Sequence, residues 1–223
     1  MRYERKYQID NMSADQIRLT IRMNPAGFIT SYPDRIVNNI YFDSIDFSKL
    51  RENRDGISKR VKIRYRWYGG LEDFRTGILE FKQKENLLGK KEKAELDLKE
   101  VHDLQDLVQM VRAVTKSEKP LLPVLMNRYR RSYFETTNGT YRITVDDDLE
   151  FYPIFEKNLN TPFQEIIEAD AADWIKETAC ILEFKYPDKD DPFVDQISQN
   201  LPFRLTKYSK FATGLQKSVG ISV

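Results

Sequence analysis

Charged and apolar residues alternate along two copies of one short sequence. LEFK occurs at residues 79–82 and again at residues 182–185. Successive side chains of a β-strand point to opposite faces, so each copy places a Glu and a Lys on one face and a Leu and a Phe on the other. Carboxylates suit a hard divalent cation and lysines suit an anion, so a pair of such strands could hold a metal ion and a phosphate together.

The same alternation recurs in other segments of the chain. Residues 61–67 place Lys62, Arg64 and Arg66 on one face and four apolar residues on the other. Residues 2–9, 78–84 and 141–146 alternate in the same way. Together the charged faces would carry Lys6, Lys62, Arg64, Arg66, Lys82, Lys84, Arg142 and Lys185, with Glu4, Glu80, Glu183 and Asp146 among them.

These charged faces could point to water or to an enclosed interior. A half-exposed antiparallel sheet is common, and for any one strand it is the simpler interpretation. The set as a whole favours an interior, because its polar faces repeat Lys and Arg with isolated acids and because amphipathic helices are present to cover the apolar faces. Crowded like charges are costly without compensation, which a polyanion would supply. The pattern therefore predicts a site for a triphosphate-like chain with Mn²⁺ or Mg²⁺, in which Arg binds phosphate oxygens bidentately.

The elements that must position these residues follow from periodicity and turn signals. Strands are expected near 2–9, 36–43, 60–68, 78–84, 90–98, 123–135, 141–151 and 179–186. Helices are expected at 13–24 with Ser13 as N-cap, at 99–115, and near 163–177, 191–200 and 207–218. These elements predict one α+β domain over residues 1–223, an antiparallel β-barrel of about eight strands with helices packed on the outside.

Composition sets weaker bounds on function. Lys and Arg number 36 and Asp and Glu number 35, so net charge says nothing about partners. The one cysteine, Cys180, cannot form an internal disulfide, and the N-terminus has no apolar signal segment. No apolar run approaches the ~18–20 residues of a membrane span. We therefore expect a cytoplasmic protein without direct membrane insertion; oligomeric state is open.

Several segments together resemble a known family. They are ERKYQI (4–9), NNIYFDS (38–44), KIRYRWYGG (62–70), LEFKQK (79–84), YRRSYF (129–134), YRITVDDDL (141–149), ILEFKY (181–186) and LTKYSKF (205–211). They resemble the VTC domain, the polyphosphate polymerase module of the vacuolar transporter chaperone complex, which belongs to the CYTH-like triphosphate tunnel metalloenzymes. Many tunnel enzymes begin with ExExK, whereas this chain has Arg2 at the first of these positions, which is closer to the VTC branch.

The resemblance implies an eight-stranded antiparallel tunnel and assigns roles to residues. The basic residues of the reaction site would be Lys6, Arg64, Arg66, Lys82, Arg131, Arg142 and Lys210. Further phosphate contacts would be Lys62, Lys84, Lys91, Tyr129, Lys185 and Lys207, with Lys90 an equally fair alternative to Lys91. Glu183 falls at the metal-binding glutamate of the family, and Glu4, Glu80 and Asp146 are the other candidate ligands. If Arg131 faces the interior, Arg128 and Arg130 must lie outside.

Three functions remain open. The first is metal-dependent transfer of the ATP γ-phosphate onto a growing polyphosphate chain. The second is hydrolysis of tripolyphosphate or a nucleoside triphosphate at the same site, and the third is a sensor that binds polyphosphate or nucleotide without turnover. A barrel for single-stranded nucleic acid would need aromatic residues on the basic faces, and Tyr65 and Trp67 lie opposite Arg64 and Arg66. No sequence-specific nucleic-acid binding is therefore expected.

Overall fold

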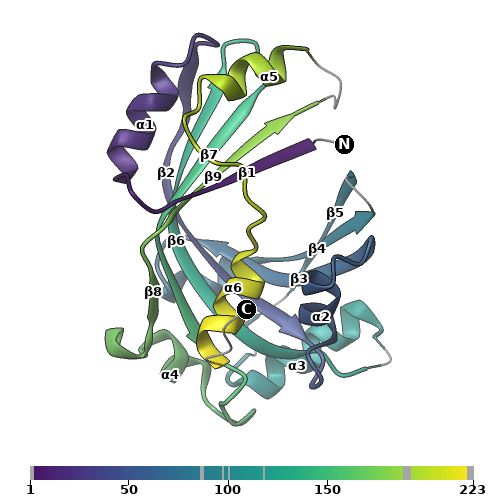
Figure 1. Cartoon of the computed structure of the whole chain (residues 1–223). Helices are drawn as coiled ribbons and strands as arrows, with labels where there is room; N and C mark the ends of the chain where they lie inside the picture. The colour runs from purple at the N-terminus through teal and green to yellow at the C-terminus, as the bar shows by residue number, and fades with distance from the viewer. Residues whose placement is uncertain are drawn as a thin grey trace.

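A curved antiparallel β-sheet forms the framework of the protein (Figure 1). The computed structural model describes residues 3–85, 88–96, 98–99, 101–117, 119–187 and 192–219, with the backbone alone described for residues 59, 84, 85 and 88–90. The strands are β1 (Tyr3–Ile9), β2 (Phe28–Asp43), β3 (Lys59–Tyr68), β4 (Ile78–Glu85), β5 (Leu88–Glu95), β6 (Leu122–Thr136), β7 (Arg142–Pro153), β8 (Ile175–Glu177) and β9 (Cys180–Tyr186). The α-helices are α1 (Ala14–Arg22), α2 (Ser48–Arg54), α3 (Leu104–Thr115), α4 (Phe163–Ile167), α5 (Pro192–Gln199) and α6 (Lys210–Val219), and the 3₁₀ helices are η1 (Glu72–Thr76) and η2 (Ala171–Asp173).

The strand order brings the segments of the charged pattern next to one another. It runs β1-β9-β7-β6-β2-β3-β4-β5, with β8 paired to β7. In the described residues, hydrogen bonds do not close this sheet between β1 and β5, so the predicted antiparallel fold is confirmed but its barrel is open. The C-terminal segment covers the edge of β1 instead, where Thr206 N donates to Lys6 O at 2.8 Å.

Helices cover the convex, apolar face of the sheet (Figure 1). Ile17 and Ile21 of α1 are fully buried and pack with Phe134, Ile143 and other residues of one half of the sheet. On the other half, α3 packs with Tyr65 and Trp67. The tyrosine and the tryptophan of β3 therefore lie on the face opposite the basic residues, as their alternation predicts.

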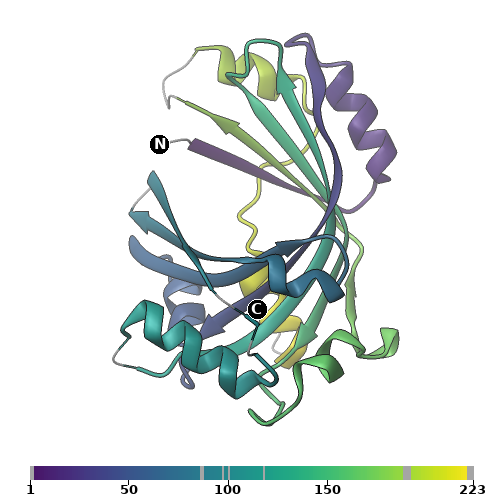
Figure 2. The ribbon, with the colours of Figure 1, turned by 180° about the vertical axis from the view of Figure 1, so that it is seen from behind.

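Helices pack outside the sheet as predicted, and α6 in addition lies inside its curve. Figure 2 shows α6 within the concavity from behind, and its Phe211 and Leu215 pack with Tyr41, Leu125 and Phe151. Gly214 makes this approach possible: a Cβ there would lie 2.4 Å from Phe151 Cδ1 and 2.6 Å from Leu125 Cδ2. The inner face is consequently apolar under α6 and charged beyond the start of that helix.

Local sequence signals predict some elements well and others poorly. Ser13 is the N-cap of α1 and forms a full capping box with Gln16. The prediction of a helix at 163–177 is wrong beyond α4, because η2 and the edge strand β8 follow. Helix α2 and the first half of β2 were not expected. None of the helices in the described parts of the chain is long and apolar enough to cross a membrane.

Candidate phosphate site on the inner face

Two neighbouring strands supply basic side chains in register. Lys62 of β3 lies opposite Lys82 of β4, and Arg64 lies opposite Glu80. Arg64 donates to Glu80 Oε2 from Nε at 2.9 Å and from Nη2 at 2.7 Å. Burial raises the pKa of Glu80, but Arg64 and Arg66 outweigh burial and hold this pKa at about 2. Glu80 is therefore an ionised carboxylate that orients arginines.

Arg66 is held by polar groups of the adjacent strands β2 and β6. It donates to Asn39 Oδ1 at 2.8 Å and to the Tyr129 hydroxyl at 3.1 Å. Asn39 in turn donates to Asn127 Oδ1 at 2.7 Å, so amides of β2 and β6 support the guanidinium. Sequence reasoning missed Asn39 and Asn127. Asn39 could have been found from the segment NNIYFDS, where its uncharged polar side chain shares a strand face with Tyr41.

Asp146 joins the sheet to α6. Arg131 donates to its two carboxylate oxygens at 2.5 and 2.7 Å, and the Lys210 ammonium donates to Asp146 Oδ2. The Lys210 Nζ also lies 4.7 Å from the centroid of the Tyr129 ring. Because Lys210 is the first residue of α6, the positive end of the helix dipole faces the same place.

The third group of charges lies on β1 and β9. Lys6 Nζ lies 3.0 Å from Glu4 Oε1 and 3.3 Å from Glu183 Oε1. Lys185 also contacts Glu183, at 3.1 Å. Burial raises the pKa of Glu183, but Lys6 and Lys185 outweigh burial and hold this pKa well below its usual value.

Lys82 links this group to β4 across the open side of the sheet. Its Nζ lies 3.6 Å from Glu4 Oε2 although β4 and β1 are not hydrogen-bonded neighbours. Burial lowers the pKa of Lys82 to about 8. Burial also lowers the pKa of Lys62 well below its usual value, and the Lys62 ammonium donates to Ser209 Oγ at 2.8 Å. The carboxylates near these two lysines thus do not offset the effect of burial on their pKa values.

Basic side chains exceed carboxylates on this face among the described residues. The basic set includes Lys6, Lys62, Arg64, Arg66, Lys82, Lys91, Arg131, Lys185 and Lys210, and the carboxylates facing it are Glu4, Glu80, Asp146 and Glu183. Lys91 contacts Glu80. A bound polyanion would supply the missing charge.

The remaining predicted residues are exposed or lie outside the described part of the chain. Arg142 is exposed at the start of β7 and contacts Glu135 at 3.3 Å. Lys207 is exposed in the segment before α6. The side chains of Lys84 and Lys90 lie outside the described residues, as does Arg2.

Arg130 and Arg131 of β6 lie on opposite faces of the sheet, as expected. Arg130 points outward and donates to Asp147 Oδ1 at 2.8 Å, while Arg131 points inward. A register shift between Arg128 and Arg130 accompanies the left-handed Asp148, whose φ is 49°. This bulge lies on β7, so it does not alter the alternation of β6.

The described side chains supply only some of the ligands that a metal ion needs. Among the described residues, no group of three or more His, Cys, Asp or Glu side chains is placed to hold a metal ion. Glu183 and Glu4 lie together at Lys6, Asp146 shares Arg131 with Glu183, and Glu80 lies with Arg64 and Arg66. Thr144, opposite Glu183 in register, is buried and its hydroxyl has no hydrogen-bond partner within the described residues. These oxygens fit Mg²⁺ or Mn²⁺ bound by one or two carboxylates plus phosphate oxygens, and do not fit an all-protein cage.

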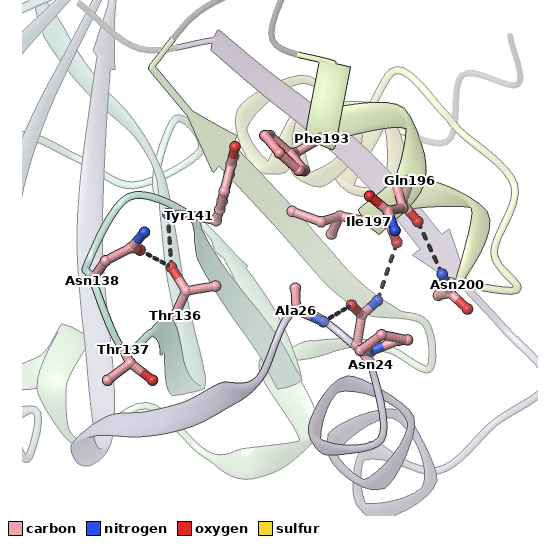
Figure 3. A pocket seen from close by; sticks show the side chains of 11 residues that line it. Asn24, Ala26, Thr136, Thr137, Asn138, Tyr141, Phe193, Gln196, Ile197 and Asn200 are labelled. Atoms are coloured by element: carbon pink, nitrogen blue, oxygen red, sulfur yellow. Dashed lines mark hydrogen bonds between the residues drawn. The ribbon is translucent and has the colours of Figure 1, made fainter.

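A separate pocket of about 420 Å³ lies on the outside of the molecule (Figure 3). It is lined by residues such as Asn24, Asn138, Tyr141 and Gln196 at the end of α1, the β6–β7 turn and α5. The predicted phosphate-site residues do not line it, so its position gives no support to phosphate chemistry.

Solved structures share this arrangement of the sheet. The PH1819 protein of Pyrococcus horikoshii OT3 matches at a TM-score of 0.53 and 13% identity, over 98% of this chain and 99% of that chain. A Hippeastrum protein, described as an adenylyl cyclase candidate with a dominant triphosphatase activity, matches at a TM-score of 0.53 and 13% identity, over 97% and 96% of the two chains. At these identities the likeness concerns the fold alone.

The family is shown by sequence. The family model of the VTC domain matches residues 1–219, and the chain belongs to this family. No curated protein sequence matches the chain.

Proposed function

We propose that this protein transfers the γ-phosphoryl group of ATP to the end of a polyphosphate chain, in a reaction that depends on a divalent metal ion. The excess of basic side chains on the inner face carries the proposal. Burial lowers the pKa of Lys62 and of Lys82 there, and a triphosphate would supply the negative charge that favours their protonated forms. Membership of the VTC domain family supports a triphosphate substrate.

Each group of side chains takes one part of the reaction. Arg64, Arg66 and Arg131 hold and orient phosphate oxygens, and their carboxylate and amide partners fix the guanidinium planes. Lys210, at the start of α6, adds positive charge beside Arg131. The bond between the γ-phosphorus and the β–γ bridging oxygen breaks, ADP leaves, and a terminal oxygen of the chain bonds to the γ-phosphorus. Such a reaction needs mainly positioning and charge neutralisation, so no nucleophilic side chain is required.

Glu183 and Glu4 would hold the metal ion, beside the Thr144 hydroxyl. A divalent ion held there would supply neutralisation of charge on the transferring phosphoryl group and would help to orient it. Lys6 and Lys185 keep Glu183 ionised and therefore able to act as a ligand.

Incubation of the pure protein with ATP and Mn²⁺, with products resolved on a gel, tests the proposal. A ladder of long phosphate chains is expected. Formation of orthophosphate alone would contradict the proposal and indicate hydrolysis, with water as the acceptor. The Hippeastrum protein, which has a similar fold, is described as a triphosphatase. Binding of tripolyphosphate without any turnover would instead support a sensor.

Matched variants test the site itself. Lys82→Ala and Glu183→Ala are each expected to lower turnover by about 100-fold, the usual effect of removing one preorganised electrostatic group. Lys176→Ala is the control, because Lys176 is an exposed lysine of β8 outside the inner face. Unchanged turnover in both site variants would overturn the assignment.

A further inference from the structure

Three tyrosine rings surround an arginine at the end of the inner face beyond Arg131. The guanidinium carbon of Arg35 lies 5.4 Å from the centroid of the Tyr32 ring, 5.8 Å from that of Tyr68 and 5.9 Å from that of Tyr133. Tyr32 and Tyr133 also meet edge to face, with centroids 5.8 Å apart. We call these four residues the tyrosine cluster.

A bulge in β2 puts two of these residues on the same face. Tyr32 lies opposite Tyr133 and Arg35 lies opposite Arg131, with a register shift between them. Three steps along β2 thus match two steps along β6. Without the extra residue, an odd separation would send Tyr32 and Arg35 to opposite faces.

The position of Tyr68 follows from its strand. It ends β3 on the same face as Lys62, Arg64 and Arg66 and lies opposite Val37 of β2. The following Gly69 adopts a φ of 96° and donates its N–H to Ile36 O at 3.1 Å, which fixes the end of the strand. The basic face of β3 therefore ends in an aromatic ring.

Arg35 differs from the other inner arginines. Arg64 and Arg131 each form an ion pair with a carboxylate. Arg35 is exposed, and within the described part of the chain it contacts aromatic rings and no carboxylate. Tyr32 and Tyr68 are 52% and 44% exposed. The two tyrosine rings and the guanidinium group of Arg35 are therefore all accessible to a ligand.

The cluster continues the line of phosphate-binding groups. Arg35 is the register partner of Arg131, which lies beside Arg66 and Tyr129. A triphosphate bound by Arg66 and Arg131 would therefore have one end close to Arg35 and the tyrosines. Nucleic-acid bases stack on aromatic side chains and on guanidinium planes, whereas an inorganic phosphate chain has no group that stacks.

We propose that the tyrosine cluster binds the nucleoside end of a nucleoside triphosphate. The base stacks on an exposed tyrosine ring, and Arg35 contacts the phosphate nearest to the sugar. This inference rests on the proposed function of the inner face as a triphosphate site. It adds that the protein distinguishes nucleoside triphosphates from inorganic tripolyphosphate but discriminates little among bases, because every base offers a face for stacking.

Calorimetric titration with ATP, GTP and inorganic tripolyphosphate tests the inference. Tyr68→Ala and Tyr32→Ala are expected to weaken ATP and GTP binding by about tenfold, the usual range for loss of one stacking partner. Tripolyphosphate should bind these variants as it binds the unmodified protein. Tyr68→Phe should retain ATP affinity, because it keeps the ring. Tyr3→Ala is the matched control, since Tyr3 stacks on Tyr186 of β9 away from the cluster.

The outcomes separate this inference from the proposed function. If the unmodified protein binds no tripolyphosphate, both are overturned. If it binds tripolyphosphate but Tyr68→Ala and Tyr32→Ala leave ATP affinity unchanged, or weaken both ligands equally, the inference alone fails. It also fails if Arg35→Ala weakens long-chain polyphosphate and not ATP, because the cluster would then serve the phosphate chain. Tyr32 is the more exposed ring, so Tyr32→Ala keeps the test available if Tyr68→Ala does not fold.

Discussion

At the scale of single residues, the inner face holds two kinds of lysine. Lys6 lies between Glu4 and Glu183, and although burial lowers its pKa, these carboxylates outweigh burial and raise it above the usual value. Lys62 and Lys82 lie opposite each other, and burial lowers the pKa of both. A bound anion would therefore change the protonation of Lys62 and Lys82 and leave that of Lys6 unchanged.

Tripolyphosphate affinity should depend on pH through Lys82. An anion favours the charged lysine, so binding raises its pKa above the value of about 8 in the free protein. Affinity should be unaffected by Lys82 below that pH and should fall as pH rises above 8, by up to about tenfold per pH unit for one linked proton. Titrations between pH 7 and pH 9.5 measure the slope. Lys82→Gln should bind more weakly and show a shallower pH dependence, because only Lys62 then gains a proton on binding; an equal slope in the variant contradicts the assignment.

Asp146 is the residue whose loss should disturb stability most. It is fully buried and accepts from both Arg131 and Lys210. Asp146→Asn leaves two buried cations without their carboxylate, and we expect the free energy of unfolding to fall by about 3–5 kcal/mol in urea titrations.

A ligand effect distinguishes this cause from simple loss of packing. Tripolyphosphate should stabilise Asp146→Asn more than it stabilises the unmodified protein, because the anion replaces the missing negative charge. Thermal unfolding with and without ligand compares the two. A smaller ligand effect in the variant would contradict this account of Asp146.

At the scale of elements, α6 determines where the charged part of the inner face begins. Its apolar side packs on β6 and β7, and its first residue, Lys210, reaches Asp146. Gly214 allows the close approach on which both contacts depend.

Gly214→Ala should therefore affect stability and binding together. The new Cβ would overlap Phe151 and Leu125, and such overpacking typically costs about 1–3 kcal/mol of unfolding free energy. Displacement of α6 should also weaken tripolyphosphate binding through Lys210. Gln216→Ala, at a half-buried position of the same helix, is the control. Increased stability of Gly214→Ala, as expected from helix propensity alone, would show that α6 leaves room for a Cβ beside Phe151 and Leu125.

The elements predicted best are those whose own residues contain the signal. Alternation in 60–68 and 78–84 predicts β3 and β4, and Ser13 with Gln16 predicts the start of α1. Helix α2 was missed because its stabilising groups come from another element: the buried Asp43 accepts from Lys49 N at 2.8 Å and from Leu50 N at 2.9 Å. Local periodicity does not show such a contact.

At the scale of the whole molecule, the sheet is curved (Figure 1). Its strand pairing brings like charges from distant segments onto the concave face. The helices outside provide the apolar contacts that stabilise this arrangement. The expectation that residues 1–223 form one domain stays a prediction.

Tripolyphosphate should stabilise the entire fold because it binds the folded inner face and not the unfolded chain. At a concentration 100 times its Kd, the expected gain is about 2.7 kcal/mol. Thermal unfolding measures it, with orthophosphate and sodium chloride at matched ionic strength as controls. Orthophosphate should stabilise less, since it spans fewer basic side chains. An equal shift from all three salts would indicate general screening and no specific site.

The sequence by itself determined which side chains share a strand face, because the period of a β-strand is two residues. It thus predicted the opposed faces of the LEFK strands, the antiparallel sheet and, through family motifs, the candidate phosphate and metal residues. Only the tertiary structure decided that no hydrogen bonds join β1 to β5 among the described residues, that α6 lies inside the sheet and that Arg142 is exposed. It also brought Tyr32, Arg35, Tyr68 and Tyr133 together, because a bulge and strand pairing across distant segments are set by packing and have no local periodic signal.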